Sequence, residues 1–127
     1  MQNRTVLIIE DNEQNLYLMR FLLEKGGFSV ADARTGRQGI SVACDIDPDI
    51  ILLDIQLPEM DGYAVAEELR RHTRLAETPI IAVTSYAMVG DRERALASGA
   101  TDYLEKPIDP STFVGQVSRH LRGREGA

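Results

Sequence analysis

Residues suited to metal and phosphoryl chemistry stand at the ends of four apolar runs in this sequence. The first run ends in two adjacent acids, Glu10 and Asp11, and the second ends in Asp54. The third ends in the hydroxyl of Thr84, and the last leads to Lys106. Three converging carboxylates without a cation would repel one another and would be costly to desolvate. Because hard divalent ions such as Mg²⁺ or Mn²⁺ take oxygen ligands, the set predicts a metal site that handles a phosphoryl group.

Asp54 is the best candidate for a nucleophile. A carboxylate can attack phosphorus and form an aspartyl-phosphate, and this transfer depends mainly on positioning and on neutralising charge on the phosphoryl oxygens. Lys106 could supply one positive charge and Thr84 one hydroxyl donor. Alone, each is an ordinary loop or strand-end residue, but combined with the acids they indicate a site. The Lys106–Pro107 bond is a candidate cis peptide, because a tight turn there would aim the ammonium inward.

Five apolar runs of strand length alternate with amphipathic stretches of helix length. These elements would have to position the residues described above. The predicted strands cover 5–10, 28–33, 49–54, 80–84 and 101–105, and the predicted helices cover 12–25, 36–44, 62–72, 87–98 and a last stretch after 109–110. The first strand is apolar on consecutive residues, which is typical of a parallel sheet covered on both faces. The weaker second strand is expected nearer an edge. Strict alternation predicts an α/β sheet with right-handed crossovers, and such sheets bind ligands at the carboxyl ends of their strands.

Turn and cap residues support these boundaries. Gly26–Gly27 ends the first predicted helix, and Asp109–Pro110 supplies an N-cap and a proline at the first helical position of the last one. Phe113, Val117 and Leu121 then recur every four residues along the last helix.

Composition narrows the class of protein. The chain has 127 residues, one domain's worth, and we expect a domain over 1–122 with a short polar tail over 123–127. A net charge of -6 argues against direct nucleic-acid binding. The single cysteine, Cys44, cannot form an internal disulfide and is expected to be a small buried residue. Neither a signal peptide nor a membrane-length apolar run is present, which predicts a cytoplasmic protein without a membrane partner.

The same residues resemble a known family, the receiver domains of two-component response regulators. The resemblance extends from Thr5 to Leu121 and is carried by motifs in family order and spacing: Glu10–Asp11, Asp54, 57–62 (LPEMDG), Thr84 and Lys106–Pro107. It implies a single doubly wound five-stranded parallel sheet of order 2-1-3-4-5 with five helices, the flavodoxin/CheY-like fold.

The resemblance also implies a role for each matching residue at the metal site. Asp54 would be the phosphoacceptor, and Asp11 and Asp54 would be direct magnesium ligands. Glu10 would bind the ion largely through water. The backbone carbonyl of Gln56 would complete the protein ligands.

Further matching positions would read the phosphoryl group. Thr84 and Lys106 would hold its oxygens. Tyr103 occupies the family's aromatic switch position, and we expect it to swing inward as Thr84 moves, which would re-form the surface of the fourth helix, fifth strand and last helix. Gln56 and Tyr86, each two residues past a site residue, would set the lifetime of the phosphate. We expect Tyr86 to shield it partly, so that Tyr86→Ala does not slow dephosphorylation.

The implied function is that of a phosphoaspartate switch in a phosphorelay. The phosphoryl group would come from a histidine kinase or a phosphotransfer protein, with magnesium. The protein would catalyse only its own phosphorylation and slow dephosphorylation, and it would signal through protein contacts. The alternative is that the chain is the receiver fragment of a hybrid histidine kinase or of a multidomain response regulator.

Three other classes of protein fit the residues less well. A haloacid-dehalogenase-type phosphatase needs a second Asp two residues after its nucleophile, where this chain has Gln56. A flavodoxin-like cofactor binder needs a first loop that cradles phosphate, but the acids of residues 10–13 would repel an anion. A pseudo-receiver would not need the intact acid, hydroxyl and lysine set.

The first predicted helix has more apolar residues than one buried face requires. Its apolar positions are Leu16, Met19 and Leu23 in one stripe, Leu18 and Leu22 in a second, and Tyr17 and Phe21 between them. One stripe must face the sheet. A leftover stripe beside the acidic site would suit docking on a helical kinase or phosphotransfer domain, although any single one of these residues could simply be core.

Overall fold

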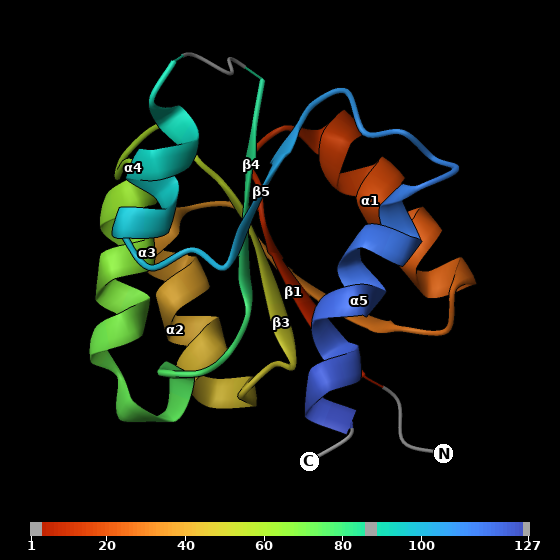
Figure 1. Ribbon diagram of the computed structural model, residues 1–127, viewed down its shortest axis with the longest axis horizontal. Helices are drawn as coiled ribbons and strands as arrows, with labels where there is room; N and C mark the ends of the chain where they lie inside the picture. Colours follow the sequence, from red (N-terminus) through yellow and green to blue (C-terminus); the bar gives the residue numbers. More distant parts are fainter. Residues whose placement is uncertain (1–3, 86–88, 126–127) are drawn as a thin grey trace.

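Five parallel strands form the centre of the molecule (Figure 1). The structure is a computed structural model and describes residues 4–85 and 89–125. The strands are β1 (Thr5–Ile9), β2 (Ser29–Ala33), β3 (Ile50–Asp54), β4 (Ile80–Thr84) and β5 (Asp102–Glu105). The helices are α1 (Glu13–Lys25), α2 (Gly36–Ile46), α3 (Gly62–Arg71), α4 (Asp91–Ala97) and α5 (Phe113–Glu125), and a short 3-10 helix, η1, covers Thr73–Leu75. The strand order is β2-β1-β3-β4-β5, as predicted.

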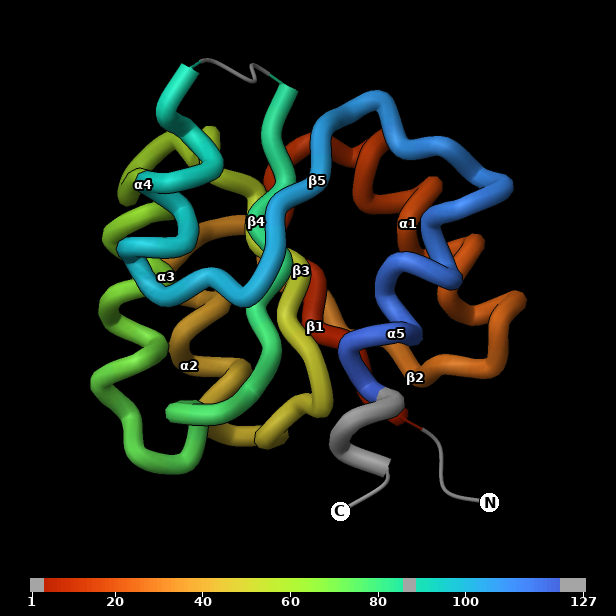
Figure 2. Tube along the Cα trace, viewed as in Figure 1, coloured from red at the N-terminus to blue at the C-terminus, as the bar shows by residue number. Residues whose placement is uncertain are grey.

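Helices cover both faces of the sheet. Helices α1 and α5 lie on one face, and α2, α3 and α4 lie on the other (Figures 1 and 2). Because successive strand residues point to opposite faces, β1 contributes to two separate cores. Val6 and Ile8 pack in the core on the α1 and α5 side, whereas Leu7 and Ile9 pack on the side of α2 and α3. The consecutive apolar residues of the first strand are therefore buried on both faces, as the sequence predicts.

Most predicted boundaries lie within two residues of the observed ones. Strand β2 is an edge strand, which agrees with its weak sequence signal. Helix α1 begins after Asn12, whose side chain accepts the N–H of Asn15 at 2.9 Å, and it ends at Lys25, with Gly26 as its C-cap. Gly27 follows with a φ of 98°, a conformation that favours glycine.

The start of the fourth helix differs from the prediction. We expected a helix from residue 87, but residues 87 and 88 lie outside the described part of the chain, and α4 begins at Asp91. Gly90 precedes it with a φ of 90°, which is incompatible with helical continuation from Val89. The sequence analysis also missed η1, where three residues close a turn between α3 and β4.

The last helix begins later than expected and extends further. Asp109 still caps a turn, since its carboxylate accepts the N–H of Ser111 at 3.0 Å, but the regular helix begins at Phe113. The helix runs to Glu125 and so continues through residues 123–125, where the sequence analysis placed a polar tail. Phe113, Val117 and Leu121 are buried against the sheet, as their spacing predicts.

Candidate functional site

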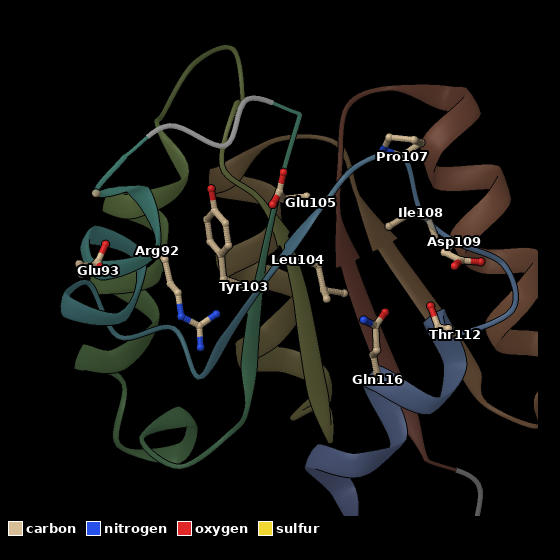
Figure 3. A pocket seen from close by; sticks show the side chains of 11 residues that line it. Arg92, Glu93, Tyr103, Leu104, Glu105, Pro107, Ile108, Asp109, Thr112 and Gln116 are labelled. Carbon is tan, nitrogen blue, oxygen red and sulfur yellow. The ribbon is translucent and has the colours of Figure 1, made fainter.

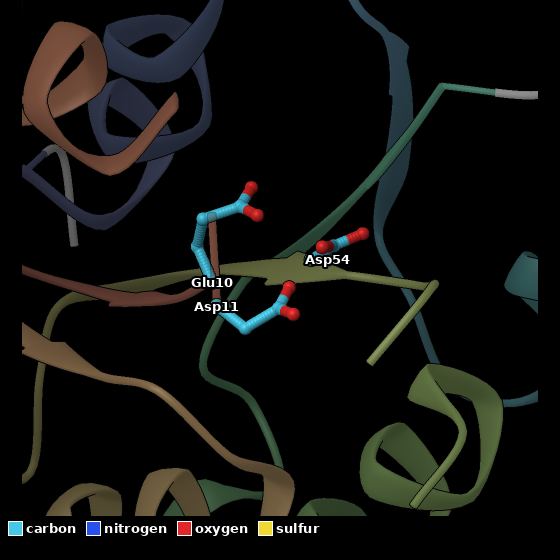
Figure 4. A group of neighbouring side chains, drawn as sticks. All are labelled: Glu10, Asp11 and Asp54. Atoms are coloured by element: carbon cyan, nitrogen blue, oxygen red, sulfur yellow. The ribbon is translucent and has the colours of Figure 1, made fainter. Parts of the chain in front are cut away.

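The acidic residues meet at the carboxyl edge of the sheet, where the strand order reverses. Strand β1 lies between β2 and β3, so the chain leaves β1 in one direction and later crosses to its other side. Ligands of such sheets bind at this point. Glu10 and Asp11 follow β1 directly, and Asp54 is the last residue of β3 (Figure 4). One carboxylate oxygen from each of the three residues lies within 4.8 Å of the others.

Lys106 reaches the same point from the loop after β5. Its Nζ lies 2.8 Å from Glu10 Oε1 and 3.6 Å from Asp54 Oδ2, and the side chain is buried. The Lys106–Pro107 bond is cis, as predicted. The Lys106 N–H donates to the carbonyl of Thr84 at 2.7 Å, which ties this loop to the end of β4. Lys106 therefore lies beside two of the predicted acids and is tied through its backbone to Thr84.

The buried acids are only partly compensated by this lysine. Burial of Glu10 raises its pKa from the usual 4.5 to about 7, because little water remains to stabilise the charge. The hydrogen bond from Lys106 lowers this pKa, whereas the neighbouring Asp54 raises it. One ammonium therefore does not offset two buried carboxylates and the exposed Asp11 beside them.

The Asp54 carboxylate is held in a fixed orientation. The backbone N–H of Gln56 donates to its Oδ1 at 2.9 Å, while Oδ2 faces Lys106. Asp54 lines a hollow of about 530 Å³ together with Lys106, Ser85, Gln56 and residues 10–15. The nucleophile predicted from the sequence is thus oriented and borders a space that could admit a phosphodonor.

A divalent cation fits the donors that border this hollow. Magnesium takes oxygen ligands at about 2.1 Å in an octahedron, so opposite ligands lie about 4 Å apart. Carboxylate oxygens of Glu10, Asp11 and Asp54 within 4.8 Å of one another need only small shifts to reach that spacing. The cluster could therefore hold a metal ion, and the ion would relieve the excess negative charge.

Thr84 does not face this hollow directly. Its side chain is buried, and its Oγ1 accepts a hydrogen bond from Nε2 of Gln56 at 2.8 Å. The other end of the same amide, Oε1 of Gln56, accepts the N–H of Ser85 at 3.1 Å. From the sequence we expected Thr84 to hold the phosphoryl oxygens. We did not foresee its hydrogen bond to the side-chain amide of Gln56.

Tyr103 is already packed against the core on the α2 and α3 side of the sheet. Its hydroxyl is buried, and within residues 4–85 and 89–125 it has no hydrogen-bond partner. Burial raises the pKa of this hydroxyl. Tyr86, the other aromatic residue that the sequence analysis assigned to the site, lies outside the described residues.

Two residues near these elements were missed from the sequence. Ser85 lines the acidic hollow and binds Gln56, but it follows Thr84 directly and carries no separate sequence signal. Asp102, at the start of β5, is buried and binds Arg119 and His120 of α5. It could have been suspected only as an acid within an otherwise apolar edge strand.

The exposed apolar surface of α1 differs from the expected one. Leu16, Met19 and Leu23 are buried, and Leu18 and Leu22 pack partly against the same core. The exposed apolar residues are instead the aromatic pair, with Tyr17 70% and Phe21 50% exposed. Their rings stack with centroids 6.3 Å apart.

Three neighbouring acids that could hold a metal ion and a lysine, at the switch point of a 2-1-3-4-5 sheet, are the arrangement expected of a receiver domain. The model of the response regulator receiver domain family matches residues 6–118. The polar-differentiation response regulator DivK of Brucella ovis is 40% identical over 118 residues, which are 93% of this chain and 96% of that protein.

Solved structures agree with this class. The chemotaxis protein CheY4 of Vibrio cholerae superposes with a TM-score of 0.90 at 27% identity, covering 94% of this chain and 100% of that one. The signal receiver domain of a histidine kinase from Syntrophus aciditrophicus has a TM-score of 0.86 and 32% identity, covering 94% and 91%. The chain therefore belongs to the response regulator receiver domain family, which is consistent with a phosphoaspartate switch in two-component signalling.

None of the helices in the described residues combines the length and apolar character needed to cross a membrane.

Proposed function

We propose that Asp54 accepts a phosphoryl group from a phosphohistidine, in a transfer that depends on a divalent cation bound by Glu10, Asp11 and Asp54. A carboxylate oxygen of Asp54 attacks phosphorus, the bond from phosphorus to the imidazole nitrogen breaks, and that nitrogen keeps the electron pair. When bound, a divalent ion would supply positive charge that neutralises the phosphoryl oxygens. The strongest support is the 3.6 Å approach of Lys106 Nζ to Asp54 Oδ2 inside a buried acid cluster.

The residues of the chain have separate tasks in this transfer. The Gln56 N–H keeps Asp54 Oδ1 in place, and Lys106 offers positive charge to the oxygens of the incoming group. Asp11, which is exposed, and Glu10, which is buried, would help to hold the ion, and the backbone carbonyl of Gln56 is the further ligand that the family implies. Gln56 and Tyr86 would then control how fast water reaches the acyl phosphate. The protein thus catalyses its own modification and slow reversal, without turnover of a free substrate.

Two surfaces are suited to the partners of such a switch. The stacked pair Tyr17 and Phe21 on α1 is proposed to dock on a histidine kinase or a histidine phosphotransfer protein, because α1 begins beside the acidic hollow. A second hollow, of about 590 Å³, lies between α4 and the start of α5 and is bordered by β5 (Figure 3). Arg92 and Glu93 come from α4, and Tyr103 and Leu104 come from β5.

The second hollow is where a downstream protein partner would read the switch. Tyr103, whose hydroxyl is buried and whose ring lines this hollow, lies in the strand next to Thr84 in β4. Movement of Thr84 toward a phosphoryl group would change the space available to the Tyr103 ring and so the shape of this surface. That the protein meets these partners in the cytoplasm stays a prediction from the sequence.

The test is chemical phosphorylation by acetyl phosphate with Mg²⁺. We expect the wild-type protein to take up acid-labile, hydroxylamine-sensitive phosphate, and Asp54→Asn to take up none. Asp45→Asn, on an exposed position of α2 far from the site, is the matched control and should behave as wild type. Uptake by Asp54→Asn at the wild-type rate would overturn the proposal.

A further inference from the structure

We propose that the Gln56 side chain is a latch that holds Thr84 away from the phosphoryl site until Asp54 is phosphorylated. In this role Gln56 is a positioning residue for the switch, in addition to any effect on phosphate lifetime. The inference rests on the proposed function of Asp54, and it concerns the equilibrium between the two positions of Thr84.

The latch consists of two hydrogen bonds from one amide. Nε2 of Gln56 donates to Thr84 Oγ1 at 2.8 Å, and Oε1 accepts the Ser85 N–H at 3.1 Å. A backbone N–H can only donate, so the Ser85 contact fixes which end of the amide faces Thr84. The amide therefore bridges the loop after β3 to the last residue of β4 and to the residue that follows it.

Gln56 also separates two hollows. It lines the acidic hollow with Asp54 and Lys106, and it lines a third hollow of about 390 Å³ together with Thr84. Tyr63 and Arg94 form another part of that third hollow, with the Arg94 guanidinium 4.1 Å from the centre of the Tyr63 ring. Thr84 lines the third hollow and Asp54 lines the acidic one, so in the proposed latch a movement of Thr84 toward a phosphoryl group on Asp54 takes its Oγ1 away from Gln56 Nε2.

The competition between the two partners of Thr84 gives the latch its direction. In the contact with Gln56 the Thr84 hydroxyl accepts from a neutral amide, whereas it would donate to phosphoryl oxygens that carry negative charge, and charge-assisted hydrogen bonds are roughly twice as strong as neutral ones. Without phosphate, Gln56 is the better partner and Thr84 stays with it. With phosphate, the charged oxygens compete successfully. A ligand shifts a conformational equilibrium only by its differential affinity, so Gln56 raises the threshold for switching.

Beryllofluoride mimics the phosphoryl group on Asp54 but is not lost by hydrolysis. Its affinity therefore reports on the latch separately from any effect of Gln56 on phosphate lifetime. Affinity would be measured at saturating Mg²⁺ in wild type and in Gln56→Met, which keeps the length of the side chain but loses both hydrogen bonds. We expect beryllofluoride to bind the variant roughly three- to tenfold more tightly, which corresponds to the loss of one or two ordinary hydrogen bonds. Gln56 is exposed, so this substitution should not prevent folding.

Gln38 offers a matched control. Its Oε1 also accepts a backbone N–H, that of Arg34 at 2.8 Å, but it lies on α2 away from the site. Gln38→Met should bind beryllofluoride as wild type does. In solution, the Ser85 amide resonance of wild type should shift when beryllofluoride binds, because its acceptor is released.

A second substitution tests whether Gln56 acts through Thr84. Thr84→Val removes the hydroxyl, and in that background Gln56→Met should no longer tighten binding. Tightening that persists without the Thr84 hydroxyl, or wild-type or weaker affinity in Gln56→Met alone, would overturn the latch. Wild-type protein that is folded and does not bind beryllofluoride would instead overturn the proposed role of Asp54, and the latch with it.

Discussion

The two ends of strand β5 are electrostatic opposites. At its start, the buried Asp102 carboxylate lies among bases: Arg119 Nη2 is 2.9 Å away, His120 Nε2 is 2.8 Å away and Arg92 Nη1 is 3.7 Å away. Just past its other end, Lys106 is a single base among acids.

The two clusters respond to their surroundings in opposite ways. Burial by itself raises the pKa of Asp102, but hydrogen bonds from the Tyr103 N–H, His120 and Arg119 outweigh it, and the pKa lies below its usual value. At the other end, burial raises the pKa of Glu10 to about 7 despite Lys106. The first cluster is complete in the protein alone, whereas the second lacks positive charge. The difference fits a structural role for the first cluster and the proposed metal and phosphoryl site for the second.

Loss of the single base should have the largest effect. We expect Lys106→Met to slow phosphorylation from acetyl phosphate roughly 100-fold, because a preorganised charge on the phosphoryl oxygens is lost. The rate of phosphate uptake at saturating Mg²⁺ measures this. Asp102→Asn is the control from the other cluster and should stay close to the wild-type rate. Equal losses in the two variants would remove the distinction between the clusters.

Asp102 should matter more for stability than for the rate of phosphorylation. Replacing Asp102 with Asn keeps an acceptor for the Tyr103 N–H but removes the charge that faces three bases. We expect the free energy of unfolding to fall by about 2 kcal/mol, the usual range for hydrogen bonds to a charged group. Urea denaturation at neutral pH without metal measures it. A loss no larger than that of Asp45→Asn would show that the cluster contributes nothing.

Added cation should stabilise only the incomplete cluster. At ten times the dissociation constant, Mg²⁺ should raise the free energy of unfolding by roughly 1.4 kcal/mol. The shift should be smaller in Asp11→Asn and should keep its full size in Asp102→Asn. Thermal unfolding with Mg²⁺ and with chelator gives both values. A full-sized shift in Asp11→Asn would place the ion elsewhere.

The loss of stability at acid pH should be the smallest of these effects. Because the pKa of folded Asp102 is below its value of 3.8 in the unfolded chain, the folded state binds fewer protons there. Its contribution is therefore present above that value and is lost as the pH falls below it. Wild type should lose more stability than Asp102→Asn between about pH 5 and pH 3. Parallel curves would show that Asp102 does not titrate differently in the folded chain.

Sequence reasoning placed the three acids together because topology does most of the positioning. Alternating strands and helices predict a parallel sheet, and the carboxyl ends of β1 and β3 then bring Glu10, Asp11 and Asp54 together whatever the packing details. The cis bond before Pro107 was also predictable, because the position of the lysine demands a tight turn.

Features that depend on where long side chains end were not predictable in this way. The Gln56 amide was assigned to water access, and its bond to Thr84 becomes visible only once the loop after β3 has a conformation. The cluster around Asp102 needs the distance from β5 to two helices. Arg70 is similar, since its guanidinium donates to the carbonyls of Gly99 and Thr78, residues 29 and 8 positions away.

Because the sheet divides the core in two, neighbouring residues of strand β1 can report separately on the two sides of the sheet. Ile8 and Ile9 are neighbours in sequence, but their side chains are buried in different cores, with α1 and α5 on one side and α2 and α3 on the other. Methyl groups placed on the two residues by isotope labelling would experience the two layers separately. A partner that docks on α1 and a rearrangement near α4 would then leave distinguishable spectroscopic signatures within a single strand.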